Sequence, residues 1–282
     1  MDVVQSPQTY GRLEQTPDSN FYKACVPRDW HGSRLPQFFN CGGRADVIHT
    51  FQALLRAHRA KPNDSYLSPG KLYALVDVDL QPGALPEGYP WATTEDVHAA
   101  LYRDGVVHEV PEDRHRIWVT ALVHKEAFFV LPSAETCWAE GLVPHFKGAP
   151  LDLRQLHAEV ARRLEGDADL ASRLDKVGER LGRFAVGTRL NASCGRDLHE
   201  SWTAATAGSS GPEYEMLVRA LLTVAKVKPV WKEIEPDSRA GHALPPETFR
   251  DQLGLRVAGQ ISDLAPSEHP LAGFFAWLKP RR

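Results

Sequence analysis

The sequence predicts an α/β domain with a mainly parallel sheet over residues 1–149, followed by a mostly α-helical domain over residues 150–282. In the first part, β-rich runs alternate with segments whose apolar residues recur at helical spacing, which is the order of an α/β layer. Gly148-Ala149-Pro150 then interrupts the pattern, and beyond it the apolar residues recur mainly at helical spacing. A chain of 282 residues is long enough for one or two domains.

The expected α/β layer consists of strands and helices in alternation. They are a strand at 35–40, a helix at 45–61, a strand at 71–80, a helix at 95–102 with Thr94 as its N-cap, and a strand at 116–123. Along the strand at 71–80, Leu72, Ala74 and Val76 alternate with Tyr73 and Leu75, so both faces are apolar. Two apolar faces are typical of a central parallel strand that is covered on both sides.

The second part contains stretches in which apolar residues form a helical stripe. They cover 153–164 after the N-cap Asp152, 170–181, and 212–227 with Pro212 in the first turn, and loops are expected at 185–211 and 233–246. The apolar stretch 269–277 follows, and we expect it to dock into the core. The alternative is that this C-terminal region anchors a partner protein.

The composition restricts the class of protein. Lys and Arg total 33 and Asp and Glu total 36, so the net charge of −3 gives no overall attraction to polyanions, and nucleic-acid binding needs a local basic face. The four cysteines are widely spread without a Cys-x-x-Cys pair, which favours reduced thiols in a cytosol over a secreted disulfide framework. No signal peptide or membrane-spanning run is visible, so we expect a cytoplasmic protein without membrane partners.

Two aspartates lie at the carboxyl end of the expected strand at 71–80. Alternation along the strand places Asp77 and Asp79 on one side of the pleat, where two carboxylates repel unless a cation or a proton lies between them. Mg²⁺ accepts one or two carboxylates together with water and phosphate, and open α/β sheets bind ligands at the carboxyl ends of their strands. The sequence therefore indicates a metal site; the alternative is a strand that simply runs into a loop, where Asp is common.

A glycine-containing turn joins the expected strand at 35–40 to the helix that follows. Gly42 and Gly43 allow a close approach of the backbone, and the N-terminus of a helix attracts anions. With Arg44 they form a candidate phosphate-binding turn, while Asp46 lies in the first helical turn, where the helix dipole favours a carboxylate. The alternative is an ordinary tight turn.

A third group of polar residues follows the expected strand at 116–123. Glu126 is a candidate third metal ligand or base, Lys125 a candidate phosphate contact, and His124 a candidate proton donor or acceptor. All three side chains are also compatible with a solvated connector between two elements. We expect Asp77, Asp79 and Glu126 to converge at one edge of the sheet if the site is a metal site.

This order of elements, over about residues 35–131, resembles the Toprim-like fold of topoisomerases, primases and overcoming-lysogenization-type nucleases. Gly43 and Asp46 match the turn after the family's first strand, and Asp77 with Asp79 matches its later Asp-x-Asp pair. Cys41 and Gly42 stand where the family has an acidic residue, usually a Glu credited with acid–base work. The resemblance implies Mg²⁺-dependent phosphodiester chemistry on nucleic acid, or else a degenerate, non-catalytic copy.

Other polar groups give competing sites. Four residues of the types that bind zinc tetrahedrally fall within 25 residues of one another: Cys25, His31, Cys41 and His49. Their spacing fits no zinc finger that we recognise. Another group surrounds the segment GRDLHE and consists of Cys194, Asp197, His199 and Glu200. A basic face for nucleic acid would draw on cations of the second part, where acidic residues are interleaved: Arg162, Arg163, Arg173, Arg180, Arg183, Arg189, Lys226, Lys228 and Lys232.

Three hypotheses about function follow. The first is a nuclease-like enzyme that performs Mg²⁺-dependent phosphodiester chemistry on nucleic acid. The second is a non-catalytic accessory or scaffold subunit of a larger nucleic-acid-processing complex. The third is a nucleotide-binding enzyme that uses the turn at Gly42 and Gly43 for phosphate.

Overall fold

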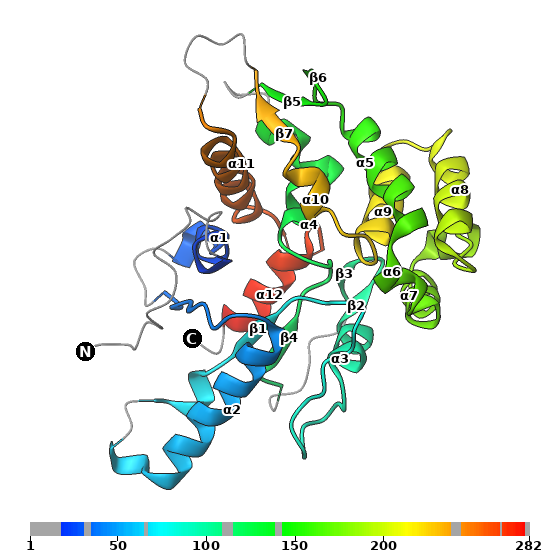
Figure 1. Ribbon diagram of the computed structural model, residues 1–282. Helices are drawn as coiled ribbons and strands as arrows, with labels where there is room; N and C mark the ends of the chain where they lie inside the picture. Colours follow the sequence, from blue (N-terminus) through cyan, green and yellow to red (C-terminus); the bar gives the residue numbers. More distant parts are fainter. Residues whose placement is uncertain are drawn as a thin grey trace.

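The computed structural model describes residues 18–30, 35–64, 67–108, 115–138, 143–237, 244–265 and 267–279. Helices predominate in these residues, and the strands are short and form small sheets. Helices α5 to α9 gather on one side of the molecule, and α1 and α11 lie together on the opposite side (Figure 1). Within the described ranges, no helix combines the length and the apolar character needed to cross a bilayer.

Most of the strands lie in the first half of the chain, interspersed with helices. That half contains α1 (Asp18–Ala24), α2 (Arg44–Ala60), β1 (Ala74–Val76), α3 (Thr94–Leu101), β2 (Tyr102–Arg103), β3 (Val106–Val107), β4 (Ile117–Val119), α4 (Glu126–Phe129), β5 (Pro144–Phe146) and β6 (Ala149–Pro150). The second half contains α5 (Leu153–Arg162), α6 (Ala168–Ala171), α7 (Leu174–Leu181), α8 (Gly195–Thr206), α9 (Gly211–Leu222), α10 (Lys228–Trp231), β7 (Ile234–Pro236), α11 (Pro246–Ile261) and α12 (Pro270–Leu278).

A parallel strand pair positions the candidate site. Strands β1 and β4 pair in parallel with Ala74 opposite Ile117 and Val76 opposite Val119, and α3 forms the crossover between them. Helix α2 packs against β1 and α3 packs against β4. The expected parallel pairing near the N-terminus is therefore confirmed, although this sheet has two strands among the described residues and each strand is shorter than predicted.

The prediction of a strand at 35–40 is wrong. The chain has no regular secondary structure there and forms no ladder with any described strand. Instead, the ring of Phe38 packs against the rings of Tyr22 and Phe275, at centroid distances of 6.2 and 6.5 Å. The side chain of Asn40 accepts a hydrogen bond from the backbone of Ser19, which fixes the end of this segment against α1.

Helix boundaries follow local capping chemistry. The N-cap of α3 is Thr93, one residue before the expected Thr94: its hydroxyl accepts from the backbone of Asp96, whose carboxylate accepts from the backbone of Thr93. Asp152 caps α5 as expected. Cys194 caps a helix, α8, inside the stretch 185–211 where a loop was expected.

The second half is more finely divided than its apolar stripes indicate. The stripe at 170–181 is split between α6 and α7, and the expected loop at 233–246 contains β7. Strand β7 pairs with β5 of the first half, which in turn pairs with β6, and both pairings are antiparallel. The sheet of the protein is therefore not mainly parallel, because the other pairings of the described strands are antiparallel.

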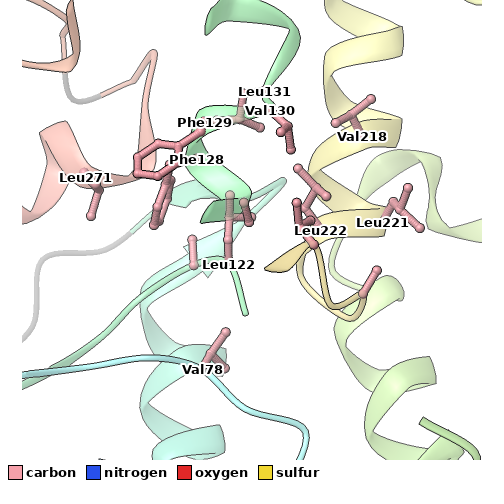
Figure 2. Packing of buried hydrophobic residues seen from close by; sticks show 14 of the residues in the cluster. Val78, Leu122, Phe128, Phe129, Val130, Leu131, Val218, Leu221, Leu222 and Leu271 are labelled. Carbon is pink, nitrogen blue, oxygen red and sulfur yellow. The ribbon is translucent and has the colours of Figure 1, made fainter. Parts of the chain in front are cut away.

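One contiguous hydrophobic cluster extends through both halves of the described chain. Figure 2 shows Leu122 and Phe128 of the first half in the same packed region as Val218, Leu221 and Leu222 of α9. The core thus shows no break at the expected boundary between residues 149 and 150, and the division into two domains stays a prediction.

Helix α12 completes the core beside the parallel pair. Its Trp277 ring lies 5.0 Å from the ring of Trp118 and 5.1 Å from that of Tyr73, and Phe274 also packs against Trp118. All residues of α12 except Ala276 are buried. The C-terminal apolar stretch docks into the core as expected, so its apolar side chains do not form a surface for a partner protein.

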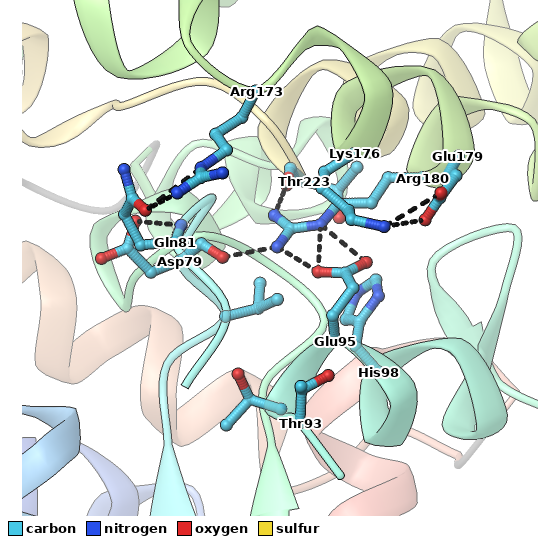
Figure 3. A network of polar contacts seen from close by, with 12 residues as sticks. Asp79, Gln81, Thr93, Glu95, His98, Arg173, Lys176, Glu179, Arg180 and Thr223 are labelled. Carbon is cyan, nitrogen blue, oxygen red and sulfur yellow. Dashed lines mark hydrogen bonds and ion pairs between the residues drawn. The ribbon is translucent and has the colours of Figure 1, made fainter. Parts of the chain in front are cut away.

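A buried ion pair joins the two halves beside β1 (Figure 3). The guanidinium of Arg180 in α7 is fully buried and donates to both carboxylate oxygens of Glu95 in α3. It also donates to the backbone carbonyls of Asp79 and Thr223, at 2.5 and 2.9 Å. Arg180 therefore fixes the segment after β1 against α3, α7 and the end of α9.

We expect Arg180→Met to lower the free energy of unfolding by about 3–5 kcal/mol, because it leaves the buried carboxylate of Glu95 without its main partner. Lys176→Met, in the same helix, removes an exposed pair with Glu179 and should change the free energy of unfolding far less. Urea unfolding monitored by circular dichroism measures both values. Equal losses in the two variants would contradict this account of the network.

We expect Gly273→Ala in α12 to lower the free energy of unfolding by roughly 1–3 kcal/mol, because an added Cβ would lie 2.3 Å from Val107 Cγ2. The matched control is Gly259→Ala in α11, where a Cβ meets no atom within 4 Å. That control should stabilise the protein slightly, since Ala is the better helix former. Thermal unfolding of the two variants compares them, and an undiminished Tm for Gly273→Ala would rule out tight docking of α12.

Candidate functional site

The carboxyl ends of β1 and β4 meet at one edge of the parallel pair. Asp77 directly follows β1, and the turn after β4 leads to His124, Lys125 and Glu126 at the start of α4. Helix α1 adds Tyr22, whose hydroxyl donates to Asp77 Oδ1 at 3.5 Å. We call Asp77, Glu126, Lys125 and Tyr22 the carboxylate site.

Asp77 holds a proton far more tightly than an ordinary aspartate. Burial, followed by the negative charges of Asp18 and Glu126, raises the pKa of Asp77 to about 7, against the weaker opposing effects of Lys125 and Tyr22. Burial and the same carboxyl, Asp77, raise the pKa of Tyr22, so this phenol remains a hydrogen-bond donor. At neutral pH, Asp77 is therefore divided between its acid and its carboxylate form.

Glu126 behaves in the opposite way. Burial raises the pKa of Glu126, but contact with His124 and the charge of Lys125 outweigh it, and the net pKa lies below the usual value. His124 Nδ1 lies 3.0 Å from Glu126 Oε2. Lys125 is itself paired with Asp18, with its Nζ 2.7 Å from Oδ1. The site thus combines an ionised glutamate with an aspartate that is readily protonated.

Such a pair can act in two ways. Carboxyl groups whose surroundings separate their pKa values can divide the roles of acid and base between them. Alternatively, a divalent cation between two carboxylates offsets their repulsion, because hard oxygen atoms are the ligands that Mg²⁺ prefers. Both uses depend on Asp77 and Glu126 lying close enough to influence each other's charge.

The structure does not bring Asp79 into this group. Strand β1 ends at Val76, but buried residues continue to alternate through Val78 and Leu80, which leaves Asp79 on the more exposed side. The side chain of Asp79 is exposed and accepts from the backbone of Gln81 at 3.4 Å, while its carbonyl binds Arg180 (Figure 3). Among the described residues, no group of three His, Cys, Asp or Glu side chains is placed to hold a metal ion.

The glycine-containing turn, a candidate phosphate-binding site, forms the N-terminal cap of α2. Gly42 has a φ of +100°, which glycine adopts readily, and Gly43 is the N-cap of α2. The backbone N–H of Gly43 donates to Asp46 Oδ2 at 3.0 Å, so a carboxylate of the chain occupies the anion position at this helix N-terminus. Arg44 extends along the chain at Gly83, where an added Cβ would lie 3.0 Å from Arg44 Nε.

The candidate zinc ligands lie in different surroundings. Cys25 is fully buried in the hydrophobic core, where burial raises the pKa of its thiol. Cys41 donates weakly to the carbonyl of Phe39, and His49 is exposed on α2. His31 falls outside the described residues. Just before the segment GRDLHE, the sulfur of Cys194 accepts a hydrogen bond from the backbone N–H of Asp197. Cys194 therefore serves as the N-cap of α8.

The basic residues of the second half pair largely with acids. Arg163 contacts both Glu159 and Glu233, and Arg189 contacts Glu213. Further pairs and contacts join Arg162 to Glu159, Arg173 to Gln81, Arg183 to Glu95 and His98, and Lys226 to Asp167 and Asp169. This pairing favours a mixed, solvated surface over a basic face.

Comparison of the chain with protein-family models, with curated proteins and with solved structures finds no significant match.

Residues that the sequence analysis did not single out complete the site. Asp18 and Tyr22 come from α1, a helix for which no element is predicted above. A signal was present: Asp18 stands at a helix start, and Phe21 and Tyr22 supply the buried residues of a short amphipathic turn. The partners of the buried pair, Glu95 and Arg180, gave no local signal, since both occur in ordinary helical patterns.

We expect Asp77→Asn to stabilise the protein at pH 8 by roughly 1–3 kcal/mol and to leave its stability at pH 4 nearly unchanged. The folded state keeps the Asp77 proton up to a pKa of about 7, whereas the unfolded chain releases it near pH 4, so wild-type stability falls as the pH rises between these values. Chemical unfolding at both pH values measures the difference. The same offset at pH 4 and pH 8 would contradict the raised pKa.

Proposed function

We propose that the protein performs Mg²⁺-dependent phosphodiester chemistry on nucleic acid at the carboxylate site, in the cytoplasm. The observation that carries the proposal is that Asp77 and Glu126 both follow the carboxyl ends of paired parallel strands, where the negative charge of Glu126 helps to raise the pKa of Asp77. The nucleic-acid substrate rests on the resemblance to the Toprim-like fold, and it is supported by the succession of α2, β1 and α3 before β4, with β2 and β3 between α3 and β4.

In this proposal, Mg²⁺ is held by a smaller ligand set than the sequence predicts. Asp77 and Glu126 would hold the ion, and one or two carboxylates suffice because Mg²⁺ keeps several waters and binds phosphate oxygens. The pKa of Asp77 is raised because burial and nearby negative charges outweigh the charge of Lys125, and a bound cation would favour the carboxylate form. When bound, the ion supplies charge stabilisation to the phosphate and lowers the pKa of a coordinated water.

The side chains around the pair have distinct roles in this proposal. Lys125, at the start of α4, contributes positive charge for a phosphate group while Asp18 holds its ammonium in place. Tyr22 keeps the carboxyl of Asp77 in position through its hydroxyl. Asp79 and the turn at Gly42 and Gly43 take no part in this version of the site.

A non-catalytic accessory subunit is the second candidate. It is favoured by the carboxylate of Asp46 at the N-terminus of α2, where a phosphate would otherwise bind. The pairing of Arg162, Arg163 and Lys226 with acids also supports it, because a paired cation is less available to a polyanion. Such a protein would act through its assembly with other subunits.

We expect wild-type protein to bind Mn²⁺, a spectroscopic substitute for Mg²⁺, and to cleave a phosphodiester such as bis(p-nitrophenyl) phosphate or single-stranded DNA. Asp77→Ala should weaken Mn²⁺ binding at least about tenfold and abolish cleavage, because it removes a ligand. Asp79→Ala is the matched control and should leave both unchanged. Calorimetric titration and a cleavage assay provide the measurements.

Wild-type cleavage by Asp77→Ala would remove this site from the reaction. If wild-type protein binds no Mn²⁺ and purifies in a stable complex, the accessory function replaces the enzymatic one.

A further inference from the structure

His98 lies in α3, the helix that crosses over between β1 and β4, and it is 3% exposed. Its Nε2 atom lies 3.2 Å from the carbonyl oxygen of Ala121, in the turn after β4. Its Nδ1 atom lies 3.0 Å from Nη1 of Arg183, just after α7. One buried ring therefore connects α3 with the parallel strand pair and with the second half of the chain.

The two partners fix the protonation state of this ring. A carbonyl oxygen only accepts hydrogen bonds, so Nε2 of His98 must carry a proton and donate it to Ala121. A guanidinium only donates, so Nδ1 must present its lone pair to Arg183. The ring is therefore the neutral Nε2–H tautomer, because an imidazolium, which carries a proton on both nitrogens, cannot make both contacts.

The charges around His98 also favour its neutral form. The carboxylate of Glu95, three residues earlier in α3, pairs with Arg180 at 2.5 Å and with Arg183 at 3.5 Å. Figure 3 shows the ring of His98 next to Glu95 and Arg180. Burial, followed by the positive charges of Arg180 and Arg183, lowers the pKa of His98 well below its ordinary value. A proton on His98 would add a third cation where one carboxylate already pairs with two.

The other titratable groups beside the ring are Tyr102 of β2 and Asp104, which follows β2. The ring of Tyr102 lies 5.1 Å from that of His98, and its hydroxyl donates to the carbonyl of Val119. Burial raises the pKa of Tyr102, so this phenol stays neutral. The carboxylate of Asp104 accepts a hydrogen bond from the backbone N–H of Ala185 at 2.7 Å. The backbone N–H of Asp104 in turn donates to the carbonyl of Arg183.

We propose that His98 is an acid-sensitive switch between the two halves of the chain. When Nδ1 gains a proton, the hydrogen bond from Arg183 is lost and an imidazolium faces a guanidinium. The segment that begins at Arg183 then separates from α3 and from the turn at Asp104. In neutral solution the ring carries no charge and the junction stays closed.

The direction of the pH dependence follows from where the proton binds. In the open form the ring of His98 is hydrated and takes up a proton below its ordinary pKa of about 6.5, whereas the closed form keeps the ring neutral. Opening therefore becomes more favourable as the pH falls below that value, by up to about tenfold per pH unit.

Hydrogen exchange at the amides of Asp104 and Ala185, which bond across this junction, measures the opening. We expect their protection in the wild-type protein, corrected for the pH dependence of exchange itself, to fall about tenfold between pH 7.5 and pH 5.5. Equal protection at both pH values would overturn the proposal.

Two variants show whether His98 causes this fall. In His98→Asn, the amide oxygen stands as many bonds from Cα as Nδ1 does, so it can accept from Arg183 but cannot gain a charge. Protection at Asp104 and Ala185 should then change less than about twofold between the two pH values. His49→Gln, which removes an exposed histidine of α2, is the control and should retain the tenfold fall. The same fall in His98→Asn would show that another group is responsible.

A measurement on the wild-type protein tests the protonation state itself and needs no variant to fold. Long-range ¹H–¹⁵N spectra at pH 7.5 should show His98 protonated at Nε2 and unprotonated at Nδ1. An imidazolium or the opposite tautomer at that pH would overturn the inference.

Discussion

A fully buried guanidinium must have its charge balanced and its N–H groups bonded, and this requirement organises the protein around Arg180. Glu95 supplies the negative charge, and the carbonyls of Asp79 and Thr223 accept further hydrogen bonds. These partners lie in α3, in the segment after β1 and at the end of α9, so a single side chain of α7 holds them together. The edge of the parallel pair that carries the carboxylate site is thus fixed by the second half of the chain.

Charge balance also explains why Asp77 differs from its neighbours. The carboxylate of Glu126 lies beside His124, and the ammonium of Lys125 pairs with Asp18. The carboxyl of Asp77, in contrast, accepts a hydrogen bond from the neutral phenol of Tyr22 and is influenced by the negative charges of Asp18 and Glu126. A group in that position either holds a proton or attracts a cation. The proposed chemistry depends on this excess of negative charge around Asp77. The accessory alternative requires that a proton on Asp77, and not a cation, offsets this charge.

The sequence predicts the elements whose signals are local. Helices α2, α3, α5 and α9 follow from apolar spacing and caps, and the apolar faces of β1 predict its parallel pairing. The prediction of a strand at 35–40 failed because Phe38 in this segment packs against rings from distant parts of the chain, and the backbone forms no strand pairing. At the site, strand direction predicts that Asp77 and Glu126 follow the same edge of the parallel pair, whereas the contact of Asp79 with the backbone of Gln81 gives no signal in the sequence. The contributions of Tyr22 and Arg180 come from distant segments, which sequence spacing does not relate.

The linkage through Arg180 also bears on how the molecule forms during synthesis. Arg180 follows Glu95 by 85 residues, and β5 remains without its partner β7 until the chain has been made well beyond α9. Closing loops of this size costs chain entropy before the long-range contacts can repay it. A nascent chain that has emerged only as far as β4 would therefore hold Glu95 without its cation, and the βαβ unit would consolidate late, once most of the polypeptide has left the ribosome.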